Sequence, residues 1–262
     1  MIFRTLIYRL GDSSINIVKN VGSFFIIFGE AVFNIFRKPF RWHLYTEQML
    51  FIGNRSISIC LLTGIFTGMV LALQMFVVLK KFSAESVIGG IVALSMAKEL
   101  GPVLTALMVN SRAGSAIAAQ IGSMRVTEQI DALRSMAVNP VQYLISPRIF
   151  SGMVMLPFLT ILVDFVGVVG GYLISVILLG LDGGLYTGKV VDLMDVSDII
   201  GGLIKATVFG IIITSVGCFF GYNTTGGAKG VGNATTGAVV TAAVSVLAAD
   251  YLITSFLIFL GL

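Results

Sequence analysis

The sequence predicts an all-α polytopic membrane protein with amino-terminal interfacial helices, five transmembrane helices and one short cytoplasmic helix. Hydrophobic residues make up 56% of the 262 residues and charged residues only 11%, whereas a soluble domain has roughly 25% charged residues. The mean hydropathy is +0.99. Five apolar stretches are long enough to cross the hydrocarbon core, which takes about 20 helical residues. These observations exclude a soluble globular chain.

The first element, residues 1–55, is predicted to form amphipathic helices in the membrane interface. Its apolar runs are interrupted by Lys19 and Glu30, and the run between these two charges holds only ten residues. Such a run is too short to cross a bilayer. One span from Ile15 to Phe36 is the alternative interpretation. The start of the chain lacks the uninterrupted apolar core of a signal peptide, so we expect it to remain in place.

An aromatic and basic group stands just before the first predicted span. Trp42 and Tyr45 lie next to Arg41 and His43, the only histidine. This combination is typical of an anchor at the level of the lipid headgroups.

The second unit, residues 56–262, is predicted to be a five-span domain. The spans are expected at about Ser56–Leu79, Val87–Val109, Phe150–Leu179, Ile199–Phe220 and Val239–Leu260. The loop at about residues 180–198 separates the third and fourth spans. The Gly- and Thr-rich segment Gly221–Gly237 lacks the residue order of a phosphate-binding loop and follows no strand, so a flexible connector is favoured.

The orientation follows from the basic residues, which favour the cytoplasmic side. With the amino terminus inside, twelve basic residues fall on inside segments: Arg4, Arg9, Lys19, Arg37, Lys38, Arg41, Arg55, Arg112, Arg125, Arg134, Arg148 and Lys229. The outside segments hold three, Lys80, Lys81 and Lys189. This asymmetry places the loop at 180–198 and the carboxyl terminus outside. It also explains the net charge of +4 without nucleic-acid binding.

A charged interruption between the second and third spans has the sequence RVTEQIDALRSMAVNP, from Arg125 to Pro140. Apolar residues recur at helical spacing on one side, which predicts a short amphipathic helix at about residues 125–137. Its polar face has mixed charge, unlike the basic face of a helix that rests on lipid. We therefore expect this helix to contact a protein.

Charged side chains at membrane depth are costly and mark candidate sites. Lys98 and Glu99 precede Gly101 and Pro102, which should loosen the helix and free backbone groups. Two interpretations remain open: a polar spot in a cavity wall, or a packing role in which the two side chains reach local partners or the interface. For three further charges, an interhelical pair or a water contact is favoured: Asp164, Lys205 and Asp250.

One helical face of the first span is a candidate acyl-chain site, with ordinary helix packing or lipid contact as the alternative. It comprises Leu71, Met75, Val78, Leu79 and Phe82. Small residues in the first and third spans are expected to allow close helix packing instead. They are Gly64, Gly68, Gly167, Gly170 and Gly171.

No catalytic site is predicted. A single histidine in the interfacial region and the absence of a G-x-S-x-G elbow leave no nucleophile with a base. Cys60 and Cys218 lie inside predicted spans and are too few for a metal cluster. We expect a chain that is not an enzyme and binds no cofactor or metal itself.

The central part of the chain resembles the MlaE family of ABC transporter permeases. The resemblance is carried by ELGP (99–102), SRAGSA (111–116), IGSMRVTEQIDALRSMAVNP (121–140) and SPR (146–148). The length, the interfacial amino terminus and the five spans agree with it. Gln120 departs from the pattern, since many members of that family carry an acid there.

The resemblance implies a homodimeric permease for phospholipid in the cell inner membrane. It implies a cytoplasmic ABC ATPase that binds ATP and Mg²⁺, a STAS-domain subunit and a periplasmic MCE-domain lipid carrier as partners. It assigns lipid binding to the face of the first span together with Glu99. It also assigns the coupling helix, which contacts the ATPase, to Thr127, Glu128, Gln129, Ile130, Asp131, Leu133, Arg134 and Met136.

Two other functions remain as alternatives. An ion- or proton-coupled secondary transporter would use the intramembrane carboxylates Glu99, Asp164 and Asp250 as a relay. A membrane scaffold for a partner complex would transport nothing. The absence of a convincing internal repeat counts against transporter folds built from inverted halves.

Overall fold

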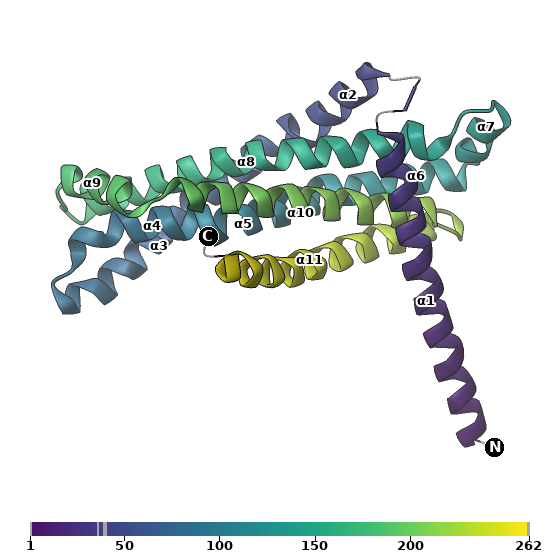
Figure 1. The fold of residues 1–262 in the computed structure, drawn as a ribbon, viewed down its shortest axis with the longest axis horizontal. Helices are drawn as coiled ribbons and strands as arrows, with labels where there is room; N and C mark the ends of the chain where they lie inside the picture. The colour runs from purple at the N-terminus through teal and green to yellow at the C-terminus, as the bar shows by residue number, and fades with distance from the viewer. Residues whose placement is uncertain (1, 36, 39–40, 261–262) are drawn as a thin grey trace.

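The computed structural model describes residues 2–35, 37–38 and 41–260. Within these residues every regular element is helical, and the long helices form an elongated bundle (Figure 1). We call its two ends the α9 end and the α7 end, after the helices that lie there. The α-helices are Ile2–Asn34 (α1), Trp42–Ile52 (α2), Ile57–Leu79 (α3), Ile88–Ser95 (α4), Gly101–Val109 (α5), Ser115–Val126 (α6), Gln129–Ser135 (α7), Ser146–Tyr172 (α8), Gly183–Leu193 (α9), Val196–Tyr222 (α10) and Gly227–Leu260 (α11).

Five helical stretches are long and apolar enough to cross a membrane, which confirms the predicted all-α fold with five spans. Several begin or end outside the predicted bounds. They are Trp42–Phe82, Glu85–Val126, Val141–Leu178, Val196–Tyr222 and Gly227–Phe259.

The first span begins earlier than predicted, because α2 continues into α3 through a single 3₁₀ turn, Asn54–Ser56. Tyr45 does not serve as a headgroup anchor as expected. It is buried, and its hydroxyl donates a 2.7 Å hydrogen bond to the carbonyl of Ile35. Trp42 is exposed, as an interfacial residue should be.

The second span runs past its predicted end at Val109. Two π-helical turns, Met96–Leu100 and Asn110–Gly114, join α4, α5 and α6 into one helical stretch. Arg112 therefore lies within the helix instead of in a loop. It donates hydrogen bonds to the hydroxyl of Ser56, at 2.8 Å, and to the carbonyl of Phe51. These groups lie where α2 breaks, so the arginine satisfies a carbonyl that the break leaves free.

The last span begins at Gly227, so the prediction of a flexible connector over Gly221–Gly237 is wrong. Only residues 223–226 are irregular, and Gly226 and Gly227 take positive φ angles of 87° and 66° in the turn. The following residues are helical because α11 packs on α6 and α10. Small residues allow this contact, as at Gly237 against the Phe220 ring. Leu262, expected outside the membrane, lies outside the described residues.

Close contacts between glycines hold α3, α8 and α10 together. A Cβ at Gly68 of α3 would collide with the carbonyl of Gly167 in α8, and one at Gly210 of α10 would collide with the carbonyl of Gly152. Backbones can approach this closely only without side chains. The predicted packing role of the small residues in the first and third spans is confirmed.

α1 is a single long helix and is not one of the five candidate spans. It crosses the bundle near the α7 end at a steep angle (Figure 1). Ser146 fixes it by donating a 2.8 Å hydrogen bond to the carbonyl of Ala31. The alternative of one span over Ile15–Phe36 is not favoured by this placement; Phe36 itself lies outside the described residues.

Candidate functional site

The segment assigned to coupling forms a turn at Thr127 and Glu128 followed by α7. It is shorter than predicted, because Arg125 and Val126 belong to the end of α6. Ile130 is fully buried and Leu133 is half-buried against the core, so these two side chains fasten α7 to its own chain. The other six assigned residues are exposed and available to a partner: Thr127, Glu128, Gln129, Asp131, Arg134 and Met136.

Both ends of α7 are set by residues in the left-handed conformation, Glu128 with φ 61° and Ala137 with φ 59°. At the carboxyl end the amide of Val138 donates to the Leu133 carbonyl at 3.0 Å, and that of Ala137 to the Arg134 carbonyl at 2.9 Å. This is the Schellman pattern of a helix terminus. The chain therefore reverses sharply on both sides of α7.

Side chains connect α7 to two other helices. Arg125 of α6 forms an ion pair with Asp131 at 2.9 Å. Arg134 donates a 2.6 Å hydrogen bond to the hydroxyl of Tyr222, the last residue of α10. A displacement of α7 therefore acts directly on α6 and α10.

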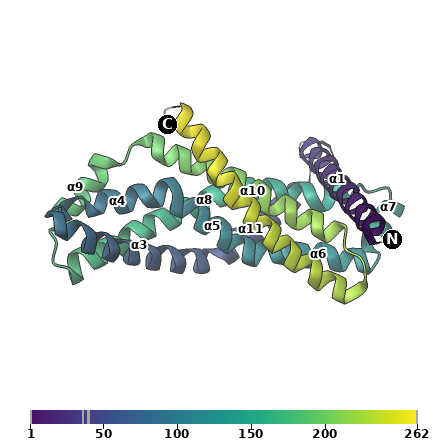
Figure 2. The ribbon, with the colours of Figure 1, turned by 90° about the horizontal axis from the view of Figure 1, so that it is seen from below.

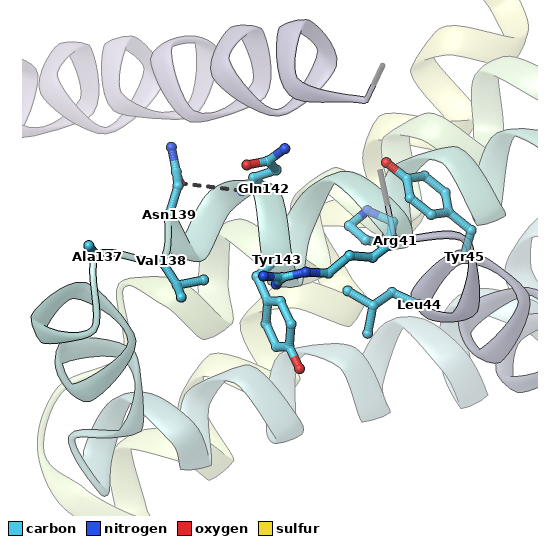
Figure 3. A pocket seen from close by; sticks show the side chains of 9 residues that line it. Arg41, Leu44, Tyr45, Ala137, Val138, Asn139, Gln142 and Tyr143 are labelled. Atoms are coloured by element: carbon cyan, nitrogen blue, oxygen red, sulfur yellow. Dashed lines mark hydrogen bonds between the residues drawn. The ribbon is translucent and has the colours of Figure 1, made fainter. Parts of the chain in front are cut away.

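The residues after α7 contact α1 and the start of α2. Asn139 donates to the Glu30 carboxylate at 2.9 Å, and its own side-chain oxygen accepts from the amide of Val141 at 2.8 Å. A small cavity of about 100 Å³ lies beside this connection, and Figure 3 shows the side chains that line it. Among them, the Arg41 guanidinium lies 5.2 Å from the centre of the Tyr143 ring. The α7–α8 connection thus lies directly against the entry to the first span.

A second polar site lies at the π-helical turn Met96–Leu100, as the Gly101–Pro102 pair predicted. Lys98 forms an ion pair with Asp198 of α10 at 2.7 Å, and Glu99 with Lys205 of α10 at 2.6 Å. Lys205 also donates to the carbonyl of Lys98 at 3.0 Å. π-Helical turns occur often at functional sites, and here the turn presents a free carbonyl to the lysine.

The carboxylate of Asp250 in α11 completes this charged cluster. It lies 3.3 Å from the buried Lys205, which confirms the expected interhelical pair. Thr254 of α11 donates to Glu99 at 3.3 Å. Lys98 and Glu99 remain 43% and 42% exposed, and both line a cavity of about 150 Å³. The cluster thus offers one cation and one carboxylate to a polar ligand.

The five candidate lipid residues, four in α3 and Phe82 in the turn after it, do not belong to the lining of that cavity. Leu71, Met75 and Leu79 are half-buried and pack against the core. Val78 is 51% exposed and Phe82 75% exposed. Within one copy of the chain, therefore, Glu99 and the α3 face do not form one described pocket, and the lipid assignment stays a prediction.

Two charges lie in places that the sequence did not fully predict. Asp164 of α8, expected to form an interhelical pair or a water contact, lies against Gly101, and its Oδ1 has no hydrogen-bond partner among the described residues, so the interhelical pair is not found there. Arg148, expected in a cytoplasmic loop, is buried in α8. It donates to the Leu144 carbonyl at 2.8 Å, and Gln120 accepts from it at 3.4 Å. The SPR motif was the one signal that pointed to this arginine.

Comparisons with known proteins identify the family. The Permease MlaE family model matches residues 45–256. The chain is 44% identical to a probable ABC transporter permease protein of Rickettsia conorii over 94% of this chain and 95% of the relative. It is 41% identical to the intermembrane phospholipid transport system permease protein MlaE of Haemophilus influenzae, over 91% and 95%. It is 38% identical to the chloroplastic protein TRIGALACTOSYLDIACYLGLYCEROL 1 of Arabidopsis thaliana, over 88% and 66%.

A permease is a transport subunit, not an enzyme, and the five helices suited to crossing a membrane fit that role. The family model covers most of the chain, including α7 and the charged cluster. This multi-pass membrane protein belongs to the MlaE permease family of ABC transporters.

Proposed function

We propose that this chain is the permease subunit of an ABC transporter that moves phospholipid between the inner membrane and a periplasmic MCE-domain lipid carrier. A relative with 41% identity is named as an intermembrane phospholipid transport permease. The observation that carries the proposal is the geometry of α7. Its exposed polar face is held on the bundle by a buried isoleucine and by the Arg134–Tyr222 hydrogen bond.

A partner ATPase that binds ATP and Mg²⁺ would bind the exposed residues of α7. When the two ATPase copies close, each would move α7. The motion would pass to α10 through Tyr222 and to α1 through the contact between Asn139 and Glu30. The fixed turns at Glu128 and Ala137 support this role, since a flexible segment would absorb the motion.

The proposed orientation places the α7 end in the cytoplasm and the α9 end in the periplasm. The basic residues support it, because Lys80, Lys81 and Lys189 belong to the turn after α3 and to α9, whereas Arg125, Arg134 and Lys229 belong to the opposite end (Figure 1). The amino terminus would lie inside and the carboxyl terminus outside. A STAS-domain subunit and the MCE protein are proposed as further partners.

Phospholipid would bind between two copies of the permease. The exposed Val78 of α3, the exposed Phe82 in the turn after it and the half-exposed Glu99 support this, since a second copy can complete a pocket that one copy leaves open. The alternative, a proton or cation relay, is less favoured. Glu99 and Asp250 share the same lysine, and pairing between helices accounts for these charges without ion transport.

The coupling proposal is tested by Glu128→Lys in the complex purified with its ATPase. Glutamate and lysine have the same backbone free-energy cost in the left-handed conformation at position 128, so only the charge changes. We expect loss of ATPase co-purification or of lipid-stimulated hydrolysis, with normal membrane insertion. Asp192→Lys, an exposed change on α9, is the matched control. Wild-type co-purification and hydrolysis in Glu128→Lys would refute the proposal.

A further inference from the structure

The largest of the described cavities is a groove of about 780 Å³ between α1, the end of α10 and the first half of α11. It lies at the α7 end and is separate from the charged cluster and from the α3 face. Figure 2 shows α11 running obliquely across the bundle, away from α1. The mechanism proposed above does not use this groove.

The floor of the groove is aromatic. Phe24 of α1 packs edge-to-face on Phe219 of α10 with 5.5 Å between ring centres, and Phe219 packs in the same way on Phe220. Phe25 lines the groove and is 63% exposed. Such an open apolar surface on a membrane protein suits an acyl chain.

The mouth of the groove is polar, and an exposed lysine stands next to a lining residue on each of its two helices. The side-chain amides of Asn20 and Asn233 line it, and neither forms a hydrogen bond with another described side chain or backbone group. Lys19 precedes Asn20, and Lys229 precedes the lining residue Gly230; both lysines are exposed. Free amide donors, with one exposed lysine next to the lining on α1 and one on α11, are complementary to a phosphate group.

The length of the groove matches one lipid leaflet. Along α11 the lining runs from Gly230 to Ser245, and the part from Asn233 to Ser245 spans roughly 18 Å at about 1.5 Å per residue. Half of the hydrocarbon core is about 15 Å thick. Because α1 lies across the bundle at the mouth, the polar end is at the level of the interface in which an amphipathic helix rests.

We propose that this groove binds one phospholipid molecule of the leaflet that contacts α1. The phosphate would lie near Lys19, Lys229 and the two asparagine amides, and an acyl chain would lie on the phenylalanines and along α11 toward Thr241. The protein would thus hold lipid at the α7 end as well as at the proposed transport pocket. This inference uses the orientation of α1 but does not require lipid transport.

The experiment is photo-crosslinking in proteoliposomes of phosphatidylethanolamine and phosphatidylglycerol that contain radiolabelled phospholipid. A photoreactive phenylalanine analogue is placed at Phe25, at Thr241 and, as control, at Val240, which is exposed on α11 but does not line the groove. We expect several times more labelled lipid on the first two positions than on Val240. Equal labelling at all three, or a covalent dimer of the chain instead of a lipid adduct, would overturn the proposal.

Two further measurements test the groove directly and distinguish failure of the groove proposal from failure of the transport-pocket proposal. Ala234→Trp should fill the groove and lower labelling at Thr241, whereas Val240→Trp should not; unchanged labelling with Ala234→Trp would also overturn the proposal. The analogue at Val78 reports on the proposed transport pocket. Lipid labelling at Val78 without labelling at Thr241 would defeat the groove alone, and the reverse result would defeat the transport pocket alone.

Discussion

Arg134 on α7 donates a 2.6 Å hydrogen bond to the hydroxyl of Tyr222, 88 positions further along the chain. Tyr222 is the last residue of α10, and α10 also carries Asp198 and Lys205 of the charged cluster. One rigid helix therefore joins the segment proposed to contact the ATPase to the charges at the π-helical turn of the second span. This relationship gives the first prediction.

Tyr222→Phe should weaken coupling without detaching the ATPase. The change removes only the hydroxyl, and a hydrogen bond from a charged donor contributes about 1.5–3 kcal/mol, with the lower value applying to this exposed pair. A loss of about 1.4 kcal/mol corresponds to a tenfold change. We therefore expect lipid-stimulated ATP hydrolysis in the purified complex to fall by roughly tenfold. Tyr251→Phe, exposed on α11, should leave hydrolysis at the wild-type rate. Normal stimulation in Tyr222→Phe would show that α10 does not receive the motion this way.

Ala137→Gly should stabilise the protein. Ala137 has a positive φ angle of 59° at the end of α7, where a side chain costs about 1 kcal/mol and glycine is the preferred residue. Thermal unfolding in mild detergent should therefore move to higher temperature. Ala132→Gly, in the interior of α7, should lower the unfolding temperature because glycine costs about 1 kcal/mol within a helix. A shift of the unfolding temperature in the same direction for both variants would contradict the left-handed geometry at Ala137.

Gln120→Glu should also stabilise the protein. Arg148 is buried, and its nearest side-chain acceptor is the neutral amide oxygen of Gln120 at 3.4 Å. A carboxylate there would turn this weak contact into an ion pair worth about 1–3 kcal/mol, because it compensates a buried charge. The unfolding temperature is the measurement, with the exposed Gln129→Glu as control. A lower unfolding temperature for Gln120→Glu would mean that Arg148 already has sufficient compensation.

The sequence predicted the elements that depend on local pattern and missed those that depend on distant partners. The helical spacing around Ile130 correctly indicated a buried face, and Gly101–Pro102 correctly indicated a loosened helix. The first part of α11, residues 227–238, was missed, because packing of α11 on α6 outweighs the low helix propensity of glycine and threonine. The role of Arg112 was missed because its partner Ser56 is 56 positions away.

The charged cluster provides a prediction about the ion pairs that Lys205 forms with Glu99 and Asp250. Lys205→Met should strongly destabilise the protein, by about 3–5 kcal/mol, because it leaves Glu99 and Asp250 without their cation. Neutralising both acids as well, with Glu99→Gln and Asp250→Asn, should recover most of the unfolding temperature. If the triple variant remains as unstable as Lys205→Met, the lysine acts through contacts other than these ion pairs.

Cysteine labelling tests the orientation. The two native cysteines, Cys60 and Cys218, are buried and should not react with a membrane-impermeant maleimide. Ser135→Cys on α7 and Thr187→Cys on α9 introduce exposed thiols at opposite ends of the bundle. In intact spheroplasts we expect labelling of Thr187→Cys only, and after permeabilisation labelling of both. The expected result follows from the basic residues, which gather at the α7 end and favour the cytoplasm. Labelling of Ser135→Cys in intact spheroplasts would show the opposite topology, in which a cytoplasmic ATPase could not reach α7.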